Sequence, residues 1–134
     1  MTAFFDTNVL LYAFANNEAK RERAQQTLAI GGTIGVQVVN EFASVLRNKQ
    51  RLDWLRIEAA LAVVENWFKS IPPLTLDTHH GAVALAREHG LAFYDALIVA
   101  AAREAGCDTL YSEDMQHGRR FGDLTVVNPF LQAE

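Results

Sequence analysis

The chain has 134 residues and a formal net charge of −4. This length suits a single domain that buries a core without disulfides, so we expect one domain over residues 1–134. The acidic balance argues against a protein that holds nucleic acid through charge alone, although a nuclease whose metal ions contact the phosphate is not excluded. A lone cysteine and no apolar run of bilayer length predict a cytoplasmic protein that makes no membrane contact.

The first half of the chain alternates short apolar runs with helical patterns. Asn16 and Asn17 separate the first two helices, and Gly31-Gly32 ends the second. The elements expected here are a strand over 2–5, a helix over 9–14, a helix over 18–30, a strand over 33–36 and a helix over 38–49.

The second half continues this alternation. Asp53 is expected to cap a helix that Pro72-Pro73 ends, and Asp77 or Thr78 to cap a helix that runs to Gly90. The other expected elements are a strand over 74–76, a nearly all-apolar helix over 93–105, and strands over 109–111 and 124–127. Strands that alternate with helices predict an α/β fold with a mostly parallel sheet.

Four carboxylates lie where expected elements begin or end: Asp6, Glu41, Asp95 and Asp114. The C-termini of parallel strands open on one edge of the sheet, where ligands bind, so these acids could converge. Clustered carboxylates resist joint ionisation unless a cation is present, and oxygen ligands suit Mg²⁺ or Mn²⁺. The sequence therefore favours a metal site at this edge.

Each acid also has a purely structural interpretation. Asp6 and Asp95 stand in good helix-capping contexts, and Glu41 lies in a first helical turn, where a negative charge is favourable. Asp114 could belong to an ordinary polar turn. Taken singly, each structural interpretation is favoured, and only the joint placement of the four acids shifts the balance toward a site.

Four segments taken together, residues 4–12, 39–41, 94–102 and 110–118, strongly resemble the PIN-domain ribonucleases, and most of all the VapC toxins of toxin–antitoxin pairs. The resemblance runs in order along essentially the whole chain. It implies a three-layer PIN-like fold, in which helices flank a small, mostly parallel sheet. It also implies a Mg²⁺- or Mn²⁺-dependent endoribonuclease, the toxin of a type II system.

The resemblance assigns roles to particular residues. The catalytic acids of the family fall on Asp6, Glu41, Asp95 and Asp114. Of these, Asp6 and Asp95 are the first choice as metal ligands and Asp114 is a further one, whereas Glu41 would orient the attacking water. Supporting polar residues fall on Thr7, Asn8 and Ser112. Glu113 is the less favoured alternative to Asp114.

The expected partners are an RNA substrate, a VapB-like antitoxin and a second copy of the chain. Arg119, Arg120 and His117 are candidate RNA contacts because they follow the Asp114 loop. The other basic runs, Lys20-Arg21, Arg23, Arg47, Lys49 and Arg51, are interpreted as solvated helix faces. Trp54, Trp67 and Phe68 are expected in the core, while Leu11, Phe14 and Phe42 belong either to the core or to a partner groove.

Competing functions remain open. A housekeeping PIN-domain ribonuclease, or a nonenzymatic partner-binding domain of the same fold, would carry the same pattern. A phosphotransfer enzyme on a similar sheet is less favoured. A haloacid-dehalogenase-type phosphatase would need an aspartate where Asn8 stands, and a receiver domain would need a lysine later than Lys69.

Overall fold

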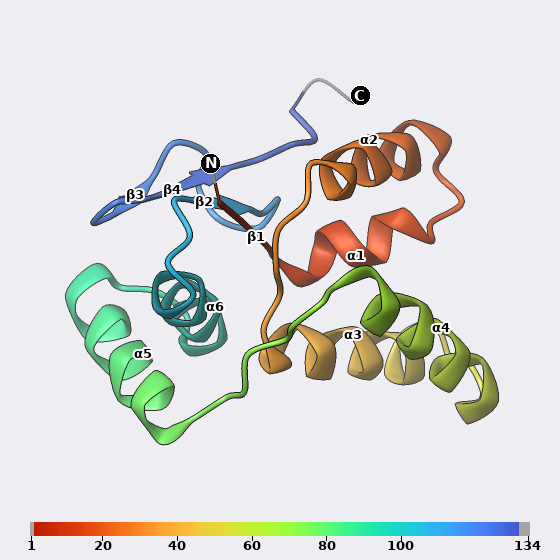
Figure 1. The fold of residues 1–134 in the computed structure, drawn as a ribbon, viewed down its shortest axis with the longest axis horizontal. Coiled ribbons are helices and arrows are strands. Elements are labelled where there is room, and N and C mark those ends of the chain that lie inside the picture. Colours follow the sequence, from red (N-terminus) through yellow and green to blue (C-terminus); the bar gives the residue numbers. More distant parts are fainter. Residues whose placement is uncertain (1, 132–134) are drawn as a thin grey trace.

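The computed structural model describes residues 2–131, which form a four-stranded sheet in the order β1-β2-β4-β3. The strands β1 (Ala3–Phe5), β2 (Thr109–Tyr111) and β4 (Leu124–Val127) are parallel, whereas β3 (Arg120–Phe121) pairs antiparallel with β4. All residues of β1 and β2 are buried, as expected where both faces of a parallel sheet are covered. The mostly parallel sheet confirms the predicted fold class (Figure 1).

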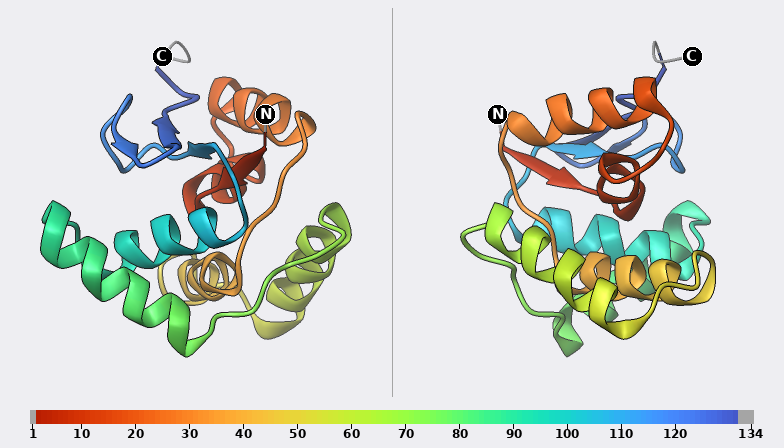
Figure 2. Two further views of the ribbon diagram at one scale, coloured as in Figure 1. Left: turned by 60° about the vertical axis from the view of Figure 1, so that its left-hand side comes forward. Right: turned by 90° about the vertical axis from the view of Figure 1, so that its right-hand side faces the viewer.

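Six helices within residues 2–131 surround this sheet. They are α1 (Thr7–Ala13), α2 (Glu18–Ala29), α3 (Val36–Asn48), α4 (Trp54–Trp67), α5 (Leu76–His89) and α6 (Phe93–Glu104). In both views of Figure 2, α2 lies on one side of the sheet, whereas α3, α5 and α6 lie on the other. The result is the expected arrangement of helices on both faces of the sheet.

Two expected strands are absent from the described residues. Residues 33–36 contribute only an isolated bridge between Thr33 and Phe4, because Val36 already begins α3. Residues 74–76 are not a strand either: Thr75 caps α5, and Leu76 is the first residue of that helix. The predicted caps Asp77 and Thr78 were therefore wrong.

The cap of α5 shows why. The hydroxyl of Thr75 accepts a hydrogen bond from the Thr78 backbone N–H at 3.2 Å, and the Thr78 hydroxyl accepts one from the Thr75 N–H at 3.4 Å. This reciprocal pair satisfies two backbone donors that would otherwise be free at a helix start. As a strand with no partner, residues 74–76 would form fewer backbone hydrogen bonds than this cap provides. The short strand β3 was not expected from the sequence.

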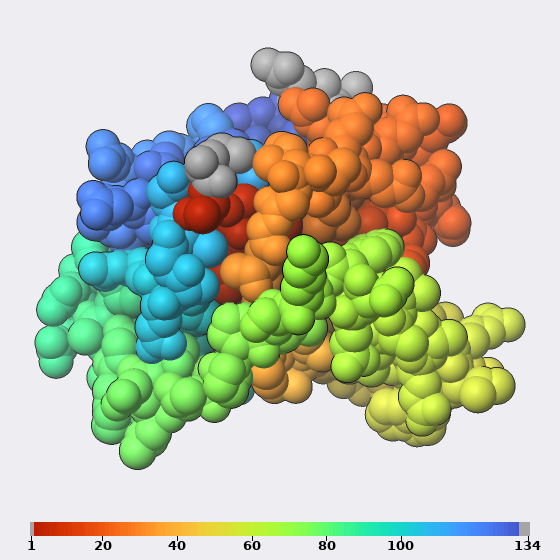
Figure 3. All heavy atoms as spheres, viewed as in Figure 1, coloured from red at the N-terminus to blue at the C-terminus, as the bar shows by residue number. Residues whose placement is uncertain are grey.

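The connections before α3 and after α4 lie side by side on one face of the molecule (Figure 3). The Val36 N–H donates to the Pro72 carbonyl at 3.3 Å, and the Thr33 hydroxyl donates to the Ser70 carbonyl at 3.1 Å. These bonds join the α3–α4 pair to the edge of β1. Over residues 2–131, no helix combines the length and apolar character that crossing a bilayer requires.

The aromatic residues near α4 do not all enter the core. Phe42 and Phe68 are buried, but Trp54 is 57% exposed and Trp67 is 44% exposed, so the expectation of two core tryptophans was wrong. Phe14 is also 43% exposed and stacks on Trp67, with 5.5 Å between ring centroids.

Candidate active site

The fold brings the four predicted acids to one cavity of about 490 Å³ at the C-terminal ends of β1 and β2. Asp6 directly follows β1, and Asp114 follows β2 by three residues. Glu41 lies on α3, and Asp95 lies in the first turn of α6. The lining residues are Asp6, Thr7, Asn8, Leu11, Tyr12, Glu41, Ser44, Val45, Lys49, Asp95, Glu113 and Asp114.

Asp6 is both a helix cap and a cavity acid. Its Oδ1 accepts a hydrogen bond from the Thr7 backbone N–H at 2.7 Å, and its Oδ2 accepts one from the Ser112 hydroxyl at 2.7 Å. The structural and functional interpretations of this residue are therefore compatible. Burial raises the pKa of Asp6 from its usual 3.8 to about 6, although these hydrogen bonds oppose the rise; the charges of Glu41 and Asp114 add to it.

Two further hydrogen bonds orient the other acids. The Thr7 hydroxyl donates to Oε2 of Glu41 at 2.7 Å, which ties the start of α1 to α3. The Asn8 amide donates to Oδ2 of Asp114 at 3.0 Å, while its Oδ1 accepts from the Glu113 backbone N–H at 3.2 Å. Thr7 and Asn8 were predicted to support Asp6; the Thr7 backbone N–H does contact Asp6, but the two side chains bond to Glu41 and to Asp114 instead.

Asp95 faces the same cavity from α6. The helix begins at Phe93 after Ala92, so Asp95 is a first-turn residue and not the cap. Burial raises its pKa, and the negative charge of Asp114 raises it further. The surroundings of Asp6 and Asp95 thus disfavour their charged forms, and a nearby positive charge would favour them.

Glu113 also lines the cavity, but its carboxylate is engaged by other side chains. It forms an ion pair with Lys20, and Oε1 accepts a hydrogen bond from the Tyr12 hydroxyl at 2.5 Å. Burial would raise the pKa of Glu113, but the Lys20 and Tyr12 hydrogen bonds and the Lys20 charge hold it below its usual value. The side chain of the neighbouring Asp114 is held at the cavity by the Asn8 amide, and the preference for Asp114 as the fourth acid stays a prediction.

The donor set is chemically suited to a hard divalent cation, because carboxylate oxygens dominate the cavity. The raised pKa values of Asp6 and Asp95 are a second sign, since a cation would favour their charged forms. In residues 2–131, however, no three His, Cys, Asp or Glu side chains are already arranged around a common metal position. A metal would therefore have to draw the carboxylates together.

The predicted RNA contacts Arg119, Arg120 and His117 do not line this cavity. Arg119 donates to the His89 carbonyl at 2.7 Å, and its guanidinium lies over the Phe121 ring. The His117 Nδ1 accepts from the Asn128 backbone N–H at 3.0 Å. Arg120 is exposed on β3. The structure thus separates these three side chains from the acids.

Two cavity residues, Tyr12 and Lys49, were not singled out by the sequence, and neither was Lys20, which pairs with the cavity residue Glu113. Tyr12 was expected only as part of a short helix, and Lys20 and Lys49 were interpreted as solvated charges. A periodicity signal existed for Lys49, the C-cap residue of α3, because it follows Glu41 by eight residues and so continues the same helical face. No local pattern indicated that Lys20 pairs with Glu113.

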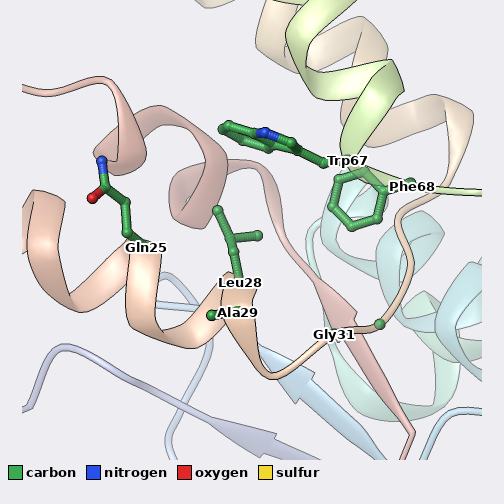
Figure 4. Close-up of a pocket in the computed structure, with 7 residues that line it drawn as sticks. Gln25, Leu28, Ala29, Gly31, Trp67 and Phe68 are labelled. Carbon is green, nitrogen blue, oxygen red and sulfur yellow. The ribbon is translucent and has the colours of Figure 1, made fainter.

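A second cavity, of about 310 Å³, is mainly apolar. Its lining residues are Gln25, Leu28, Ala29, Gly31, Gly32, Trp67 and Phe68. Figure 4 shows the Trp67 and Phe68 rings facing the end of α2 across this space. None of these residues can serve as a general acid or nucleophile.

The comparison with protein families decides the classification. The family model of the PIN domain matches residues 3–120, which is most of the chain. The chain belongs to the PIN domain family. This PIN domain has no significant match among curated protein sequences.

Solved structures show the same fold. One is a toxin–antitoxin complex from Klebsiella pneumoniae, with 25% identity, a TM-score of 0.71, and coverage of 96% of this chain and 98% of that chain. Another is the sarcin–ricin loop-cleaving toxin VapC20 of Mycobacterium tuberculosis, with 20% identity, a TM-score of 0.68, and coverage of 84% of this chain and 90% of that chain. A third is VapBC2 from Rickettsia felis, with 17% identity, a TM-score of 0.66, and coverage of 94% of this chain and 97% of that chain.

Proposed function

We propose that this PIN domain is a metal-dependent endoribonuclease and the toxin of a type II toxin–antitoxin system. The observation that carries the proposal is the placement of Asp6, Glu41, Asp95 and Asp114 around one cavity at the C-terminal edge of the sheet. Membership of the PIN family, and the likeness to a toxin–antitoxin complex and to an RNA-cleaving toxin, support it.

Asp6, Asp95 and Asp114 are the proposed ligands of Mg²⁺ or Mn²⁺. Such an ion, when bound, supplies a positive charge that polarises the phosphate and acidifies water. The hydrogen bonds from Thr7 and Ser112 hold both oxygens of the Asp6 carboxylate in place. The Asn8 amide performs the same task for Asp114.

Glu41 is the proposed residue that orients the attacking water. Its Oε2 accepts the Thr7 hydrogen bond, which fixes the carboxylate from the α1 side. The other oxygen can then accept a hydrogen bond from water, aligning a lone pair of that water with the phosphorus. Attack by water breaks the P–O3′ bond and leaves a 5′-phosphate and a 3′-hydroxyl.

The test uses the purified chain with structured RNA. Cleavage should require added Mg²⁺ or Mn²⁺ and should stop with EDTA, and mapping of the RNA ends should show 5′-phosphates. A doubly substituted Asp6→Asn/Asp95→Asn protein is the control for contaminating nuclease. Cleavage by the wild-type chain that persists in EDTA, while the control protein is inactive, would refute the metal mechanism.

The proposed partners are a VapB-like antitoxin and a second copy of the chain. The Klebsiella pneumoniae relative is a toxin–antitoxin complex, and the apolar cavity beside Trp67 and Phe68 offers a surface for an apolar partner segment (Figure 4). Co-expression with the neighbouring gene product should relieve toxicity and allow co-purification. Toxicity that no neighbouring protein relieves would favour a housekeeping ribonuclease, and RNA binding without cleavage would favour a nonenzymatic domain.

A further inference from the structure

The wall of the acidic cavity formed by α3 changes from negative to positive along its length. Glu41, Val45 and Lys49 all line the cavity, and they recur at intervals of four residues on one face of the helix. With a rise of about 1.5 Å per residue, the Cα atoms of Glu41 and Lys49 are about 12 Å apart along the axis. Lys49 is the one Lys, Arg or His among the described lining residues.

Positive charge continues beyond Lys49 into the α3–α4 connection. Arg47, Lys49, Arg51 and Arg56 lie within residues 47–56, so four of the twelve Lys and Arg residues of an acidic chain fall in ten positions. The one acid in this segment, Asp53, caps α4 by accepting a hydrogen bond from the Arg56 N–H at 2.9 Å. The connection projects from the body at the lower right of Figures 1 and 3.

An exposed aromatic ring completes this segment. Trp54 is 57% exposed, and the Arg47 guanidinium lies 4.7 Å from its ring centroid. Arg47 is held there because it also donates to the Leu52 carbonyl at 3.1 Å. A ring that is supported on one face by a fixed guanidinium can accept a nucleobase on its other face.

The backbone of this connection is also unusual. Arg51 has a φ of 56°, the only positive φ outside glycine within residues 2–131. The Leu52 N–H donates to the Leu46 carbonyl at 3.0 Å, which holds the turn in this form. Glycine or asparagine would adopt this conformation more easily, so a positive charge is present here despite a backbone cost.

We propose that single-stranded RNA leaves the acidic cavity along α3, with a flanking phosphate on Lys49 and a base stacked on Trp54. The inference rests on the proposed ribonuclease function. A cationic groove beside an aromatic platform is the combination that binds single strands. An acidic protein segment would satisfy the cations but has no base to stack on Trp54.

The two tryptophans provide a matched experiment. In an Asp6→Asn background, which prevents cleavage, Trp67→Phe leaves Trp54 as the only tryptophan, and Trp54→Phe leaves only Trp67. Titration with a single-stranded RNA oligonucleotide should quench the Trp54 emission saturably and leave the Trp67 emission nearly unchanged. Quenching confined to Trp67, or no quenching of Trp54 while fluorescence anisotropy shows binding, overturns the proposal, as does a failure to bind.

A matched pair of lysines tests the phosphate contact. Lys49→Ala and Lys69→Ala each remove one exposed lysine, but only Lys49 lines the cavity. In the otherwise wild-type protein, Lys49→Ala should raise KM about 5- to 10-fold with little change in kcat, and should reduce the slope of log Kd against log salt by about one. Lys69→Ala should change KM less than about 2-fold.

The outcomes separate the two proposals. If the wild-type chain cleaves RNA but Lys49→Ala and Lys69→Ala behave alike, the α3 track is refuted and the ribonuclease function stands. If the wild-type chain does not cleave RNA, the proposed function itself fails. If Trp54→Leu abolishes antitoxin capture but leaves RNA affinity unchanged, the segment is a protein-binding surface and the track is again refuted.

Discussion

At the scale of single residues, the Asp6 carboxylate is buried next to other acids, and its pKa is raised to about 6. It is 4% exposed, and Glu41 and Asp114 add repulsion to the cost of burial. Hydrogen bonds from Thr7 and Ser112 offset only part of this cost. A buried charge with such neighbours is typical of a site that receives a cation.

Replacing a proposed metal ligand should abolish most activity. Asp6→Asn and Asp95→Asn each remove a negative charge at nearly constant shape, and each should lower kcat/KM at least about 100-fold, which is the upper end for changes to groups that only support a ligand. Steady-state cleavage assays at saturating Mn²⁺ would measure this. Retention of near-wild-type activity by either variant would remove that residue from the proposed site.

The loop after β2 offers a test of register. Asp114 is held at the cavity by Asn8, whereas Glu113 is engaged by Lys20 and Tyr12. Asp114→Asn should therefore reduce kcat/KM far more than Glu113→Gln. The opposite order in the same cleavage assay would show that Glu113 is the fourth acid.

The raised pKa of Asp6 makes the stability of the metal-free protein depend on pH. Its pKa rises from 3.8 in the unfolded chain to about 6 in the fold, so the folded state binds the proton more tightly between these values. The free energy of unfolding should therefore fall as pH rises from about 4 to about 6, by about 3 kcal/mol from this group.

Asp6→Asn should lack that part of the pH dependence. Asn can keep the Thr7 hydrogen bond through its oxygen and donate its amide to the Ser112 hydroxyl, so the cap is largely preserved. Urea denaturation of both proteins in EDTA, at pH 4.5 and pH 7, would isolate the Asp6 contribution as the difference between them. Identical pH dependence in the two proteins would contradict a raised pKa of Asp6 in the folded state.

At the scale of elements, β1 is held by a close approach of the connection before α3. A Cβ on Gly32 would lie 2.4 Å from the Ala3 carbonyl oxygen and 2.9 Å from the Phe5 ring. Gly31→Ala, by contrast, would meet no atom within 4 Å but has a φ of 88°. The two glycines are thus required for different reasons, one by space and the other by conformation.

Gly32→Ala should destabilise the fold by about 2–3 kcal/mol, because the connection must move away from β1. Gly31→Ala should cost only about 1 kcal/mol, through its left-handed backbone. Chemical denaturation of the two variants would measure the difference. A Gly32→Ala protein as stable as Gly31→Ala would mean that the connection moves freely, and that β1 does not depend on it for its position.

A second element-scale contact joins α2 to the loop after β2. The Lys20 ammonium pairs with Glu113 and lies 4.5 Å from the Tyr12 ring centroid and 5.1 Å from that of Phe130. Lys20→Met keeps much of the packing but removes the charge, and should cost about 0.5–1 kcal/mol since the pair is only partly buried. Thermal melts would measure this; a larger loss of activity than of stability would instead place Lys20 in the reaction.

At the scale of the whole molecule, cation binding should stabilise the folded chain. Mg²⁺ that binds only the folded state adds about 2.7 kcal/mol at a concentration 100 times its Kd. For a chain of this size, that corresponds to a rise in Tm of roughly 5–15 °C. Melts over a Mg²⁺ titration at constant ionic strength should show this rise for the wild type and a smaller one for Asp6→Asn. No shift at millimolar Mg²⁺ would count strongly against the site.

The sequence alone predicted all six helices of the described residues, the strands β1, β2 and β4, and the placement of the four acids at element ends. This is because hydrophobic periodicity and capping residues act over a few positions, so short windows contain the information. The prediction from sequence failed where the formation of a strand depended on a partner strand far away in the chain. Residues 33–36 had a strand-like composition, but only Thr33 reaches β1 before Val36 starts α3.

Only the tertiary structure decided which side chains meet at the acids. Ser112 and Asp6 are 106 residues apart, as are Asn8 and Asp114, and parallel crossovers bring each pair together. The same packing placed Lys20 on Glu113, Lys49 in the cavity wall, and Arg119 on the His89 carbonyl. A charged side chain has no periodic local signature for its partner, so its role depends on how distant elements pack.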